Sequence, residues 1–321
     1  MNANLLADQV TRVVERASLA PSIHNSQPWL FRSSGPTLQI WADRRRHLHG
    51  IDPTGRQLTV SIGAAVEYAR LALRAEGFDV ECALCPDPTV TDLMATLTVT
   101  RPLAVDSVTR SLVHAMPRRA TYRDAFDARP VPAAVISRLR EAAHEVGCGT
   151  HVVSEGQQAE LIGLLERAEL TELMRADYRH ELERWRSHEV DAVDGVPDAA
   201  IPTQSRRVSR MPIRRFDLDQ VRTPDPASVD DPVVLAITTT TDETTDWLLA
   251  GRGLAQVLLH ATLAGVQASP LTQSLDNPLD RHRTGRALGL LGYAQMVLRL
   301  GYGRPAPTSP RRPVSETLTR S

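Results

Sequence analysis

The residues most suited to chemistry crowd into one early stretch, APSIHNSQPWLF at positions 20–31. Ser22, Asn25 and Gln27 place one hydroxyl and two amides close together, and Pro21 restricts the backbone in front of them. These groups donate and accept neutral hydrogen bonds, and none of them is a strong acid, base or nucleophile. The stretch therefore indicates a surface that presents hydroxyl and amide groups to a bound molecule.

The basic residues are unusual, because all 37 of them are arginine and the chain has no lysine. A guanidinium group stays protonated at neutral pH and binds phosphate through two parallel hydrogen bonds. Schiff-base chemistry of the pyridoxal type, which needs a lysine amine, is excluded. The formal charge of −1 and the pI of about 6.8 give no reason to expect binding to nucleic acid or to a membrane surface.

Other chemical motifs are weak or missing. Cys82 and Cys85 have the spacing of a redox pair or of half a zinc site, but no second Cys or His pair follows to complete a metal site. The sequence has no P-loop, no GxGxxG, no GxSxG and no HExxH motif. We therefore expect no metal centre and no dedicated catalytic side chain.

The composition is that of an ordinary globular chain. It has 321 residues, of which 42% are hydrophobic and 23% charged, enough for one large or two medium domains. No window approaches eighteen apolar residues, and the N-terminus has neither a signal-peptide core nor a cleavage site. We therefore expect a cytoplasmic protein.

Hydrophobic periodicity predicts the elements that position the polar stretch. An amphipathic helix precedes it at 5–19, and a strand begins at Trp29. A second helix, at 59–77, is apolar on nearly all sides and should be buried centrally. Further strands are predicted at 38–42, 80–84 and 95–100, and further helices at 135–146 and 251–265.

The order of these elements indicates an internal duplication. The helical sequence at 135–146 aligns with 10–20 at an offset of 126, and 251–265 aligns with 63–77 at an offset of 188. Two matches in the same order predict two copies, at 1–114 and 115–321, with an insertion in the second copy. We place the insertion at 157–232.

The predicted insertion begins with a long charged helix at 157–189 and continues through 191–232 with six prolines and little apolar periodicity. A long connection of this kind is either a lid or a linker. Met211, Ile213 and Phe216 stand among arginines at 206, 207, 210, 214 and 215. These apolar side chains suggest that part of the segment docks onto the rest of the protein.

The early polar stretch resembles the P-S-x-x-N-x-Q-P-W-x-F signature of FMN-dependent nitroreductases and flavin reductases. In that superfamily the segment runs along the edge of the isoalloxazine ring, so the resemblance assigns Pro21, Ser22, Ile23, Asn25 and Gln27 to flavin binding. It also implies an α+β nitroreductase-like fold. The duplication and the insertion resemble the fused, Acg-type branch of the superfamily, which is mycobacterial and associated with dormancy.

The second half carries the complementary motifs. The sequence PRRATYRDAF at 117–126 resembles the R-x-S-x-R/K segment that binds the FMN phosphate in the family, and Arg-Arg-Pro at 311–313 resembles the C-terminal phosphate motif. By this resemblance the turn after the second central helix faces flavin N5 with its backbone amides. The residues assigned in this way are Arg119, Thr121, Arg123, Ser269, Pro270, Leu271, Arg311 and Arg312.

Each half thus retains one part of a flavin site. The first half has the ring-edge motif but no phosphate arginines, whereas the second has the arginines but reads GCGTH at 147–151 where the ring-edge motif should be. Classical nitroreductases bind FMN between two subunits. The resemblance therefore predicts a monomer in which the two copies form an internal pseudo-dimer that binds one FMN.

Two functions follow from the resemblance. The first is an NAD(P)H-dependent oxidoreductase that passes hydride through FMN to a nitroaromatic, a quinone or a similar small electron acceptor. The second is an FMN storage or sequestration protein whose pocket is covered by the insertion. Flavin chemistry on a special substrate, such as reductive dehalogenation or flavin fragmentation, is a third interpretation, and the sequence leaves all three open.

Overall fold

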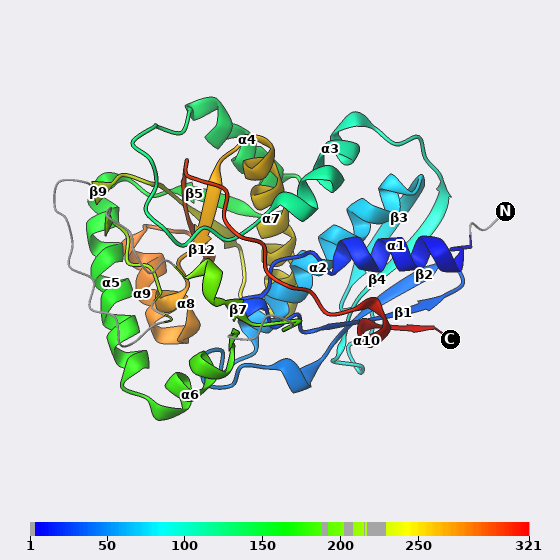
Figure 1. Ribbon diagram of the computed structural model, residues 1–321, viewed down its shortest axis with the longest axis horizontal. Helices are drawn as coiled ribbons and strands as arrows, with labels where there is room; N and C mark the ends of the chain where they lie inside the picture. The colour runs from blue at the N-terminus through cyan, green and yellow to red at the C-terminus, as the bar shows by residue number, and fades with distance from the viewer. Residues whose placement is uncertain (1–3, 188–191, 202–207, 215, 217–228, 321) are drawn as a thin grey trace.

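The computed structural model describes residues 4–187, 192–201, 208–214, 216 and 229–320. It is an α+β fold in which two sheets flank a central pair of long helices (Figure 1). In Figure 1 the first half of the chain forms the right side of the molecule and most of the second half forms the left side. Its two largest hydrophobic clusters belong mainly to these two halves.

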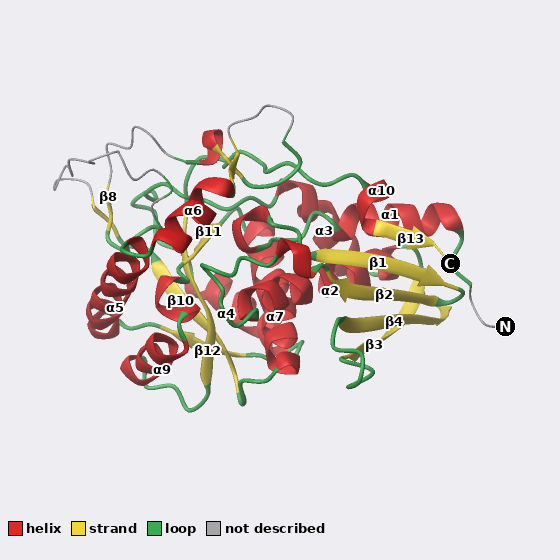
Figure 2. Ribbon diagram, turned by 90° about the horizontal axis from the view of Figure 1, so that it is seen from below, coloured by secondary structure: helices red, strands yellow, loops and turns green. Residues whose placement is uncertain are grey.

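The first half builds a five-stranded sheet in the order β13-β1-β2-β4-β3 (Figure 2). Its strands are antiparallel except for β13, which runs parallel to β1 and comes from the C-terminus. The elements are α1 (Ala7–Ala17), β1 (Trp29–Ser34), β2 (Thr37–Ala42), α2 (Arg56–Ala75), β3 (Phe78–Leu84), β4 (Leu93–Pro102) and α3 (Ser107–Ala115), and the last strand is β13 (Leu318–Arg320).

The second half builds a four-stranded antiparallel sheet in the order β11-β12-β10-β5. Its elements are α4 (Ala133–His144), β5 (Gly149–Val152), β10 (Val233–Thr239), α7 (Thr244–Leu263), β11 (Gln267–Pro270), α8 (Gln273–Asp276), α9 (Pro278–Ala287), β12 (Tyr293–Gly301) and α10 (Val314–Thr317). Reading β5, β10, β11 and β12 as counterparts of β1, β2, β3 and β4 gives the same neighbours in both sheets. The fold therefore consists of two copies of one arrangement.

The central helices cross at two glycines, and the contacts across this crossing are reciprocal. A Cβ atom on Gly63 of α2 would lie 2.2 Å from the backbone oxygen of Leu248, and one on Gly251 of α7 would lie 2.0 Å from that of Val60. Both pairs are related by the offset of 188, which also relates the two helices from end to end. Gly63 contacts Leu248 of the other copy, and their counterparts Gly251 and Val60 contact each other in the same way. Such reciprocal contacts are those expected across a two-fold axis.

The segment between β5 and β10 has no counterpart in the first half, where β1 and β2 are joined by the short turn at 35–36. It contains α5 (Glu155–Leu173), α6 (Ala176–Arg184) and two small strand pairs, β6 (Arg186–Ser187) with β7 (Val196–Pro197) and β8 (Val208–Ser209) with β9 (Val229–Asp230). The prediction of one helix over 157–189 was wrong. Arg175 takes an extended backbone that starts a new helix, and that helix buries Tyr178 and Leu182 against Leu48.

The C-terminal segment leaves the second half and crosses to the first sheet, where β13 pairs with β1 (Figure 1, red). Phe31 of β1 lies opposite Leu318 in this parallel pair. The crossing brings residues 309–312 past the early polar stretch. Among the described residues, no helix is long and apolar enough to cross a membrane.

Candidate functional site

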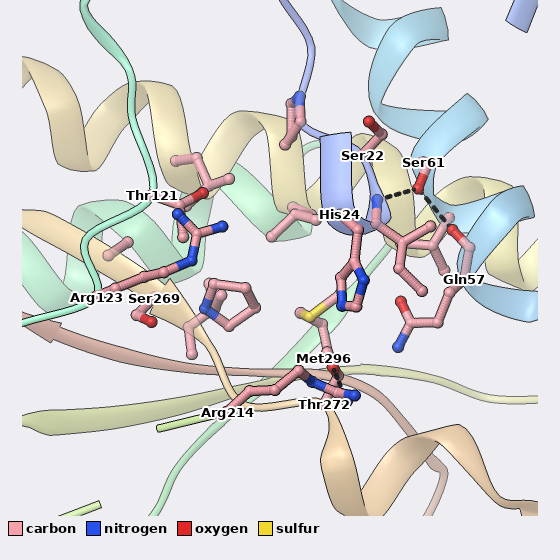
Figure 3. A pocket seen from close by; sticks show the side chains of 18 of the residues that line it. Ser22, His24, Gln57, Ser61, Thr121, Arg123, Arg214, Ser269, Thr272 and Met296 are labelled. Carbon is pink, nitrogen blue, oxygen red and sulfur yellow. Dashed lines mark hydrogen bonds between the residues drawn. The ribbon is translucent and has the colours of Figure 1, made fainter. Parts of the chain in front are cut away.

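A cavity of about 110 Å³ lies where the two halves meet, beside the crossing of α2 and α7. Its wall combines residues from the early polar stretch, α2, the segment after α3, α7, β11, β12 and the insertion (Figure 3). Seven of the residues assigned to a flavin by resemblance line it: Pro21, Ser22, Ile23, Thr121, Arg123, Ser269 and Pro270. The fold thus brings these seven residues together from both halves.

The early polar stretch reaches the cavity through an uncommon backbone. His24, Asn25 and Gln27 have φ angles of 45°, 57° and 48°, in the left-handed region that non-glycine residues seldom adopt. Two hydrogen bonds of ordinary length fix this turn: the Gln27 amide donates to Ser22 Oγ and the Ile23 amide donates to Ser61 Oγ, both at 3.0 Å. Backbone strain of this kind clusters at functional sites.

Asn25 and Gln27 do not line the cavity. Asn25 Nδ2 donates to the backbone oxygens of Gly195 and Pro310, each at 3.1 Å, so that it joins the insertion to the C-terminal segment. Gln27 Nε2 donates to the Val193 oxygen at 2.8 Å. The partners of both side chains are therefore these crossing segments rather than groups in the cavity.

Three arginines assigned to flavin binding lie close to one another with no carboxylate partner in the described part of the chain. Arg119 is 7% exposed and its Nε atom has no partner among these residues. Burial, followed by repulsion from Arg119, lowers the pKa of Arg123 to about 10 and that of Arg311 to about 9. Arg123 and Arg311 therefore remain cationic at neutral pH.

Among the described residues, Arg311 donates to neutral oxygens only. Its Nη1 donates to Asn25 Oδ1 at 3.1 Å and to the Pro310 oxygen at 2.8 Å, and its Nη2 donates to the Leu19 oxygen at 3.1 Å. Buried like charges without an opposite charge are costly. The group around Arg119 and Arg311 is therefore electrostatically incomplete without an anion.

Arg312 is in a different position, because it has carboxylate partners. Its guanidinium lies 3.5 Å from Glu316 and 3.8 Å from Asp43. Its backbone amide also donates to Gln27 Oε1 at 2.8 Å. Arg311 is therefore the better candidate for an anion contact, and Arg312 anchors the C-terminal segment.

The turn assigned to flavin N5 lies at the end of β11. Ser269 and Pro270 line the cavity, but Leu271 is fully buried beside α8, outside the cavity. The Leu271 amide donates to the Val297 oxygen at 2.8 Å, and proline has no amide hydrogen. Neither residue therefore has a free backbone donor for a ligand.

Several residues that line the cavity were not singled out from the sequence. His24 contributes a ring whose Nδ1 has no partner among the described residues, and burial followed by the charges of Arg214 and Arg123 lowers its pKa well below the usual value. Gln57 and Ser61 lie on the polar side of α2 (Figure 3). Because α2 is buried on nearly every side, its periodicity gave no indication of which residues face a cavity.

The insertion forms one side of the cavity through Ile213, Arg214 and Phe216. The Phe216 ring packs edge-on against His24 with centroids 5.1 Å apart, and the Arg123 guanidinium lies 5.3 Å from the same ring. Met211 instead packs into the cluster around Leu161 and Leu165. Met211 thus docks onto the rest of the protein but outside the cavity, and the arginines at 206, 207 and 215 lie outside the described residues.

Arg214 anchors this part of the insertion. It contacts Tyr178, pairs with Asp276, and lies 3.5 Å from Glu172, so that two carboxyl groups share one guanidinium. Asp276 also accepts a hydrogen bond from Gln57 at 2.9 Å. Burial raises the pKa of Glu172 to about 8, against the pull of Arg214. Burial raises the pKa of Asp276 as well, so two carboxyl groups that both resist ionisation share the one guanidinium of Arg214.

The cysteines take no part in this site. Cys82, Cys85 and Cys148 are free thiols, and burial raises the pKa of Cys82 and Cys148. The described residues contain no cluster of His, Cys, Asp and Glu that could hold a metal ion. Nothing in the cavity wall resembles a nucleophile with its own base.

Comparison with known proteins places the chain in a family. It is 33% identical over 320 residues to a Mycobacterium tuberculosis H37Rv protein named as a candidate NAD(P)H nitroreductase, covering 97% of this chain and 91% of the relative. The chain belongs to the nitroreductase family. A second member from the same organism, Acg, named in the same way, is 27% identical over 317 residues and is covered to 95% of its length. No protein-family profile matches the sequence.

Solved nitroreductase structures are more distant. The FMN-dependent nitroreductase NfnB of Mycobacterium smegmatis, crystallised with NADPH, is 17% identical, with a TM-score of 0.42 over 67% of this chain and 100% of its own. A nitroreductase from Desulfitobacterium hafniense with bound FMN is 15% identical, with a TM-score of 0.41 over 65% of this chain and 97% of its own.

Proposed function

We propose that the protein is a flavoprotein oxidoreductase that binds FMN between its two halves and passes hydride from NAD(P)H to a small electron acceptor. The observation that carries the proposal is the buried pair Arg119 and Arg311, which has no carboxylate partner among the described residues. Arg119 directly precedes Ala120 and Thr121 in the wall of the cavity between the halves, and neither arginine lines that cavity itself. The Mycobacterium tuberculosis relatives at 33% and 27% identity, both named as candidate NAD(P)H nitroreductases, support the same assignment.

The residues present fit FMN by their chemistry. A phosphate would supply the negative charge that Arg119 and Arg311 lack, through charge-assisted hydrogen bonds. The aliphatic side of the cavity, with Leu254, Leu258 and Met296, suits the flat faces of an aromatic ring system. The group and the residues are therefore complementary in charge and in polarity.

FMN supplies the hydride chemistry when it is bound, so the protein needs only to bind, orient and tune the groups that react. Arg123 lies in the cavity as a cation without a carboxylate partner, and positive charge near a flavin favours its reduction. Ser22 and Thr121 offer hydroxyl groups from opposite halves. His24 is neutral and offers a hydrogen bond, but it has no proton to give as an imidazolium at neutral pH.

A second candidate function, storage or sequestration of FMN, is favoured by one observation. Ile213 and Phe216 of the insertion form part of the cavity wall. The cavity of about 110 Å³ is smaller than the roughly 300 Å³ or more of typical ligand pockets, so this part of the wall would have to move before a flavin could enter. An insertion that stays in this position over a bound flavin would prevent nicotinamide from stacking on the ring.

Anaerobic reduction of the purified, FMN-loaded protein by NADPH or NADH distinguishes these candidates. We expect the visible flavin absorbance to bleach within seconds to minutes and to return when a quinone or a nitroaromatic is added. Bleaching by dithionite but not by either nicotinamide would contradict the oxidoreductase proposal. In that case, restoration of the NADPH reaction by Phe216→Ala would identify the insertion as the barrier, because the truncation removes the ring that covers His24.

A further inference from the structure

A buried tyrosine hydroxyl lies beside the two phosphate-candidate arginines. Tyr68 is fully buried on α2 and is not part of the cavity wall described above. Its hydroxyl has no partner of ordinary hydrogen-bond geometry among the described residues, although the Arg119 side chain is near enough to act on it as a hydrogen-bond donor. Buried hydroxyl groups are nearly always bonded, so an isolated one indicates a missing partner.

The surroundings of Tyr68 identify the kind of partner. Burial raises the pKa of Tyr68, and the nearby charges of Arg119 and Arg311 oppose that rise. The same two arginines have Nε atoms without partners in the described part of the chain. One hydroxyl and two guanidinium groups from three separate segments thus lie close together, and the Tyr68 hydroxyl and both Nε atoms have no partner of ordinary hydrogen-bond geometry among the described residues.

We propose that the Tyr68 hydroxyl donates a hydrogen bond to the phosphate of the bound flavin nucleotide, as a third ligand beside Arg119 and Arg311. This inference rests on the proposed function, because it assigns a further residue to the same flavin site. A hydroxyl donor adds a directional bond to the phosphate without adding a third positive charge to an already crowded cationic group.

The second copy differs at the corresponding position. The residue 188 positions after Tyr68 is Gln256, whose Nε2 donates to Glu67 at 2.6 Å. Glu67 is fully buried and pairs with Arg70 and Arg252. A carboxylate therefore stands where a second phosphate would need positive charge, and the tyrosine belongs to a site that only one half retains.

The Tyr68→Phe variant tests the proposal through binding of FMN and of riboflavin, which lacks the phosphate. We expect FMN affinity to fall about tenfold or more, in the range for a hydrogen bond to a charged group, and riboflavin affinity to stay within twofold. Removal of an unpaired buried hydroxyl should leave the Tm of the flavin-free protein unchanged or raise it. If Tyr68 had only a structural role, the Tyr68→Phe substitution would instead lower the Tm and weaken the binding of FMN and riboflavin alike.

Tyr122→Phe is the matched control, because Tyr122 is also buried but its hydroxyl already donates to the Ala125 oxygen at 3.0 Å. We expect that variant to keep the wild-type ratio of FMN to riboflavin affinity. If wild type and Tyr68→Phe bind FMN equally well, or if the variant loses as much affinity for riboflavin as for FMN, the role of Tyr68 is overturned but the proposed function is not. Absence of FMN binding by the wild type would overturn the proposed function as well.

Discussion

Arg119 and Arg311 repel each other in a buried setting, and only an anion removes that cost. We expect Arg119→Ala and Arg311→Ala each to weaken FMN binding by about 1.5–3 kcal/mol, the range for a lost charge-assisted hydrogen bond. Ser22→Ala should cost less, because its contact is neutral. Fluorescence titration of flavin-free protein measures these affinities, with Arg304→Ala as an exposed control. Wild-type affinity in both buried variants would refute the phosphate assignment.

Some individual residues could be predicted from the sequence, and others could not. Pro21, Ser22 and Ile23 lie at the cavity as the motif indicated. Asn25 and Gln27 belong to the same motif but donate hydrogen bonds to the insertion, and Asn25 also to the C-terminal segment. Neither a backbone angle nor the distant partners at 193–195 and 310–312 can be read from local sequence.

At the scale of elements, the crossing of α2 and α7 determines where the halves meet. We expect Gly63→Ala and Gly251→Ala each to destabilise the fold by about 1–3 kcal/mol, because a new methyl group would lie against backbone atoms that cannot move without shifting a helix. Gly163→Ala on α5 is the matched control, because nothing lies within 4 Å of its added methyl group. We expect this variant to be more stable to unfolding by about 0.5–1 kcal/mol, because alanine favours a helix over glycine. Urea unfolding measures all three, and equal stability of the Gly63 and Gly251 variants to wild type would contradict the close crossing.

The elements themselves followed well from periodicity wherever one face was buried. The predicted helices at 5–19, 59–77 and 135–146 are confirmed with shifts of a few residues. The break between α5 and α6 was missed, because their sequence is charged on most sides and the break depends on burial of Tyr178 in another part of the molecule. Tertiary packing decided that boundary, not local preference.

At the scale of the whole molecule, the two copies have the same strand order and a reciprocal helix crossing, but their sites are unequal. One side has Arg119, Arg311 and the cavity. The related side has Glu67 with Arg70 and Arg252, a network that is already balanced. We therefore propose a monomer with a single flavin site, in which the second site of an ancestral dimer has been lost.

Flavin stoichiometry tests this proposal most directly. Protein loaded with excess FMN is freed of unbound flavin, its mass in solution is measured by light scattering, and the FMN released on denaturation is quantified per chain. An internal pseudo-dimer with one retained site predicts one FMN per chain and the mass of a 35.3 kDa monomer. Two FMN per chain, or a stable homodimer that requires two chains to hold each flavin, would contradict it.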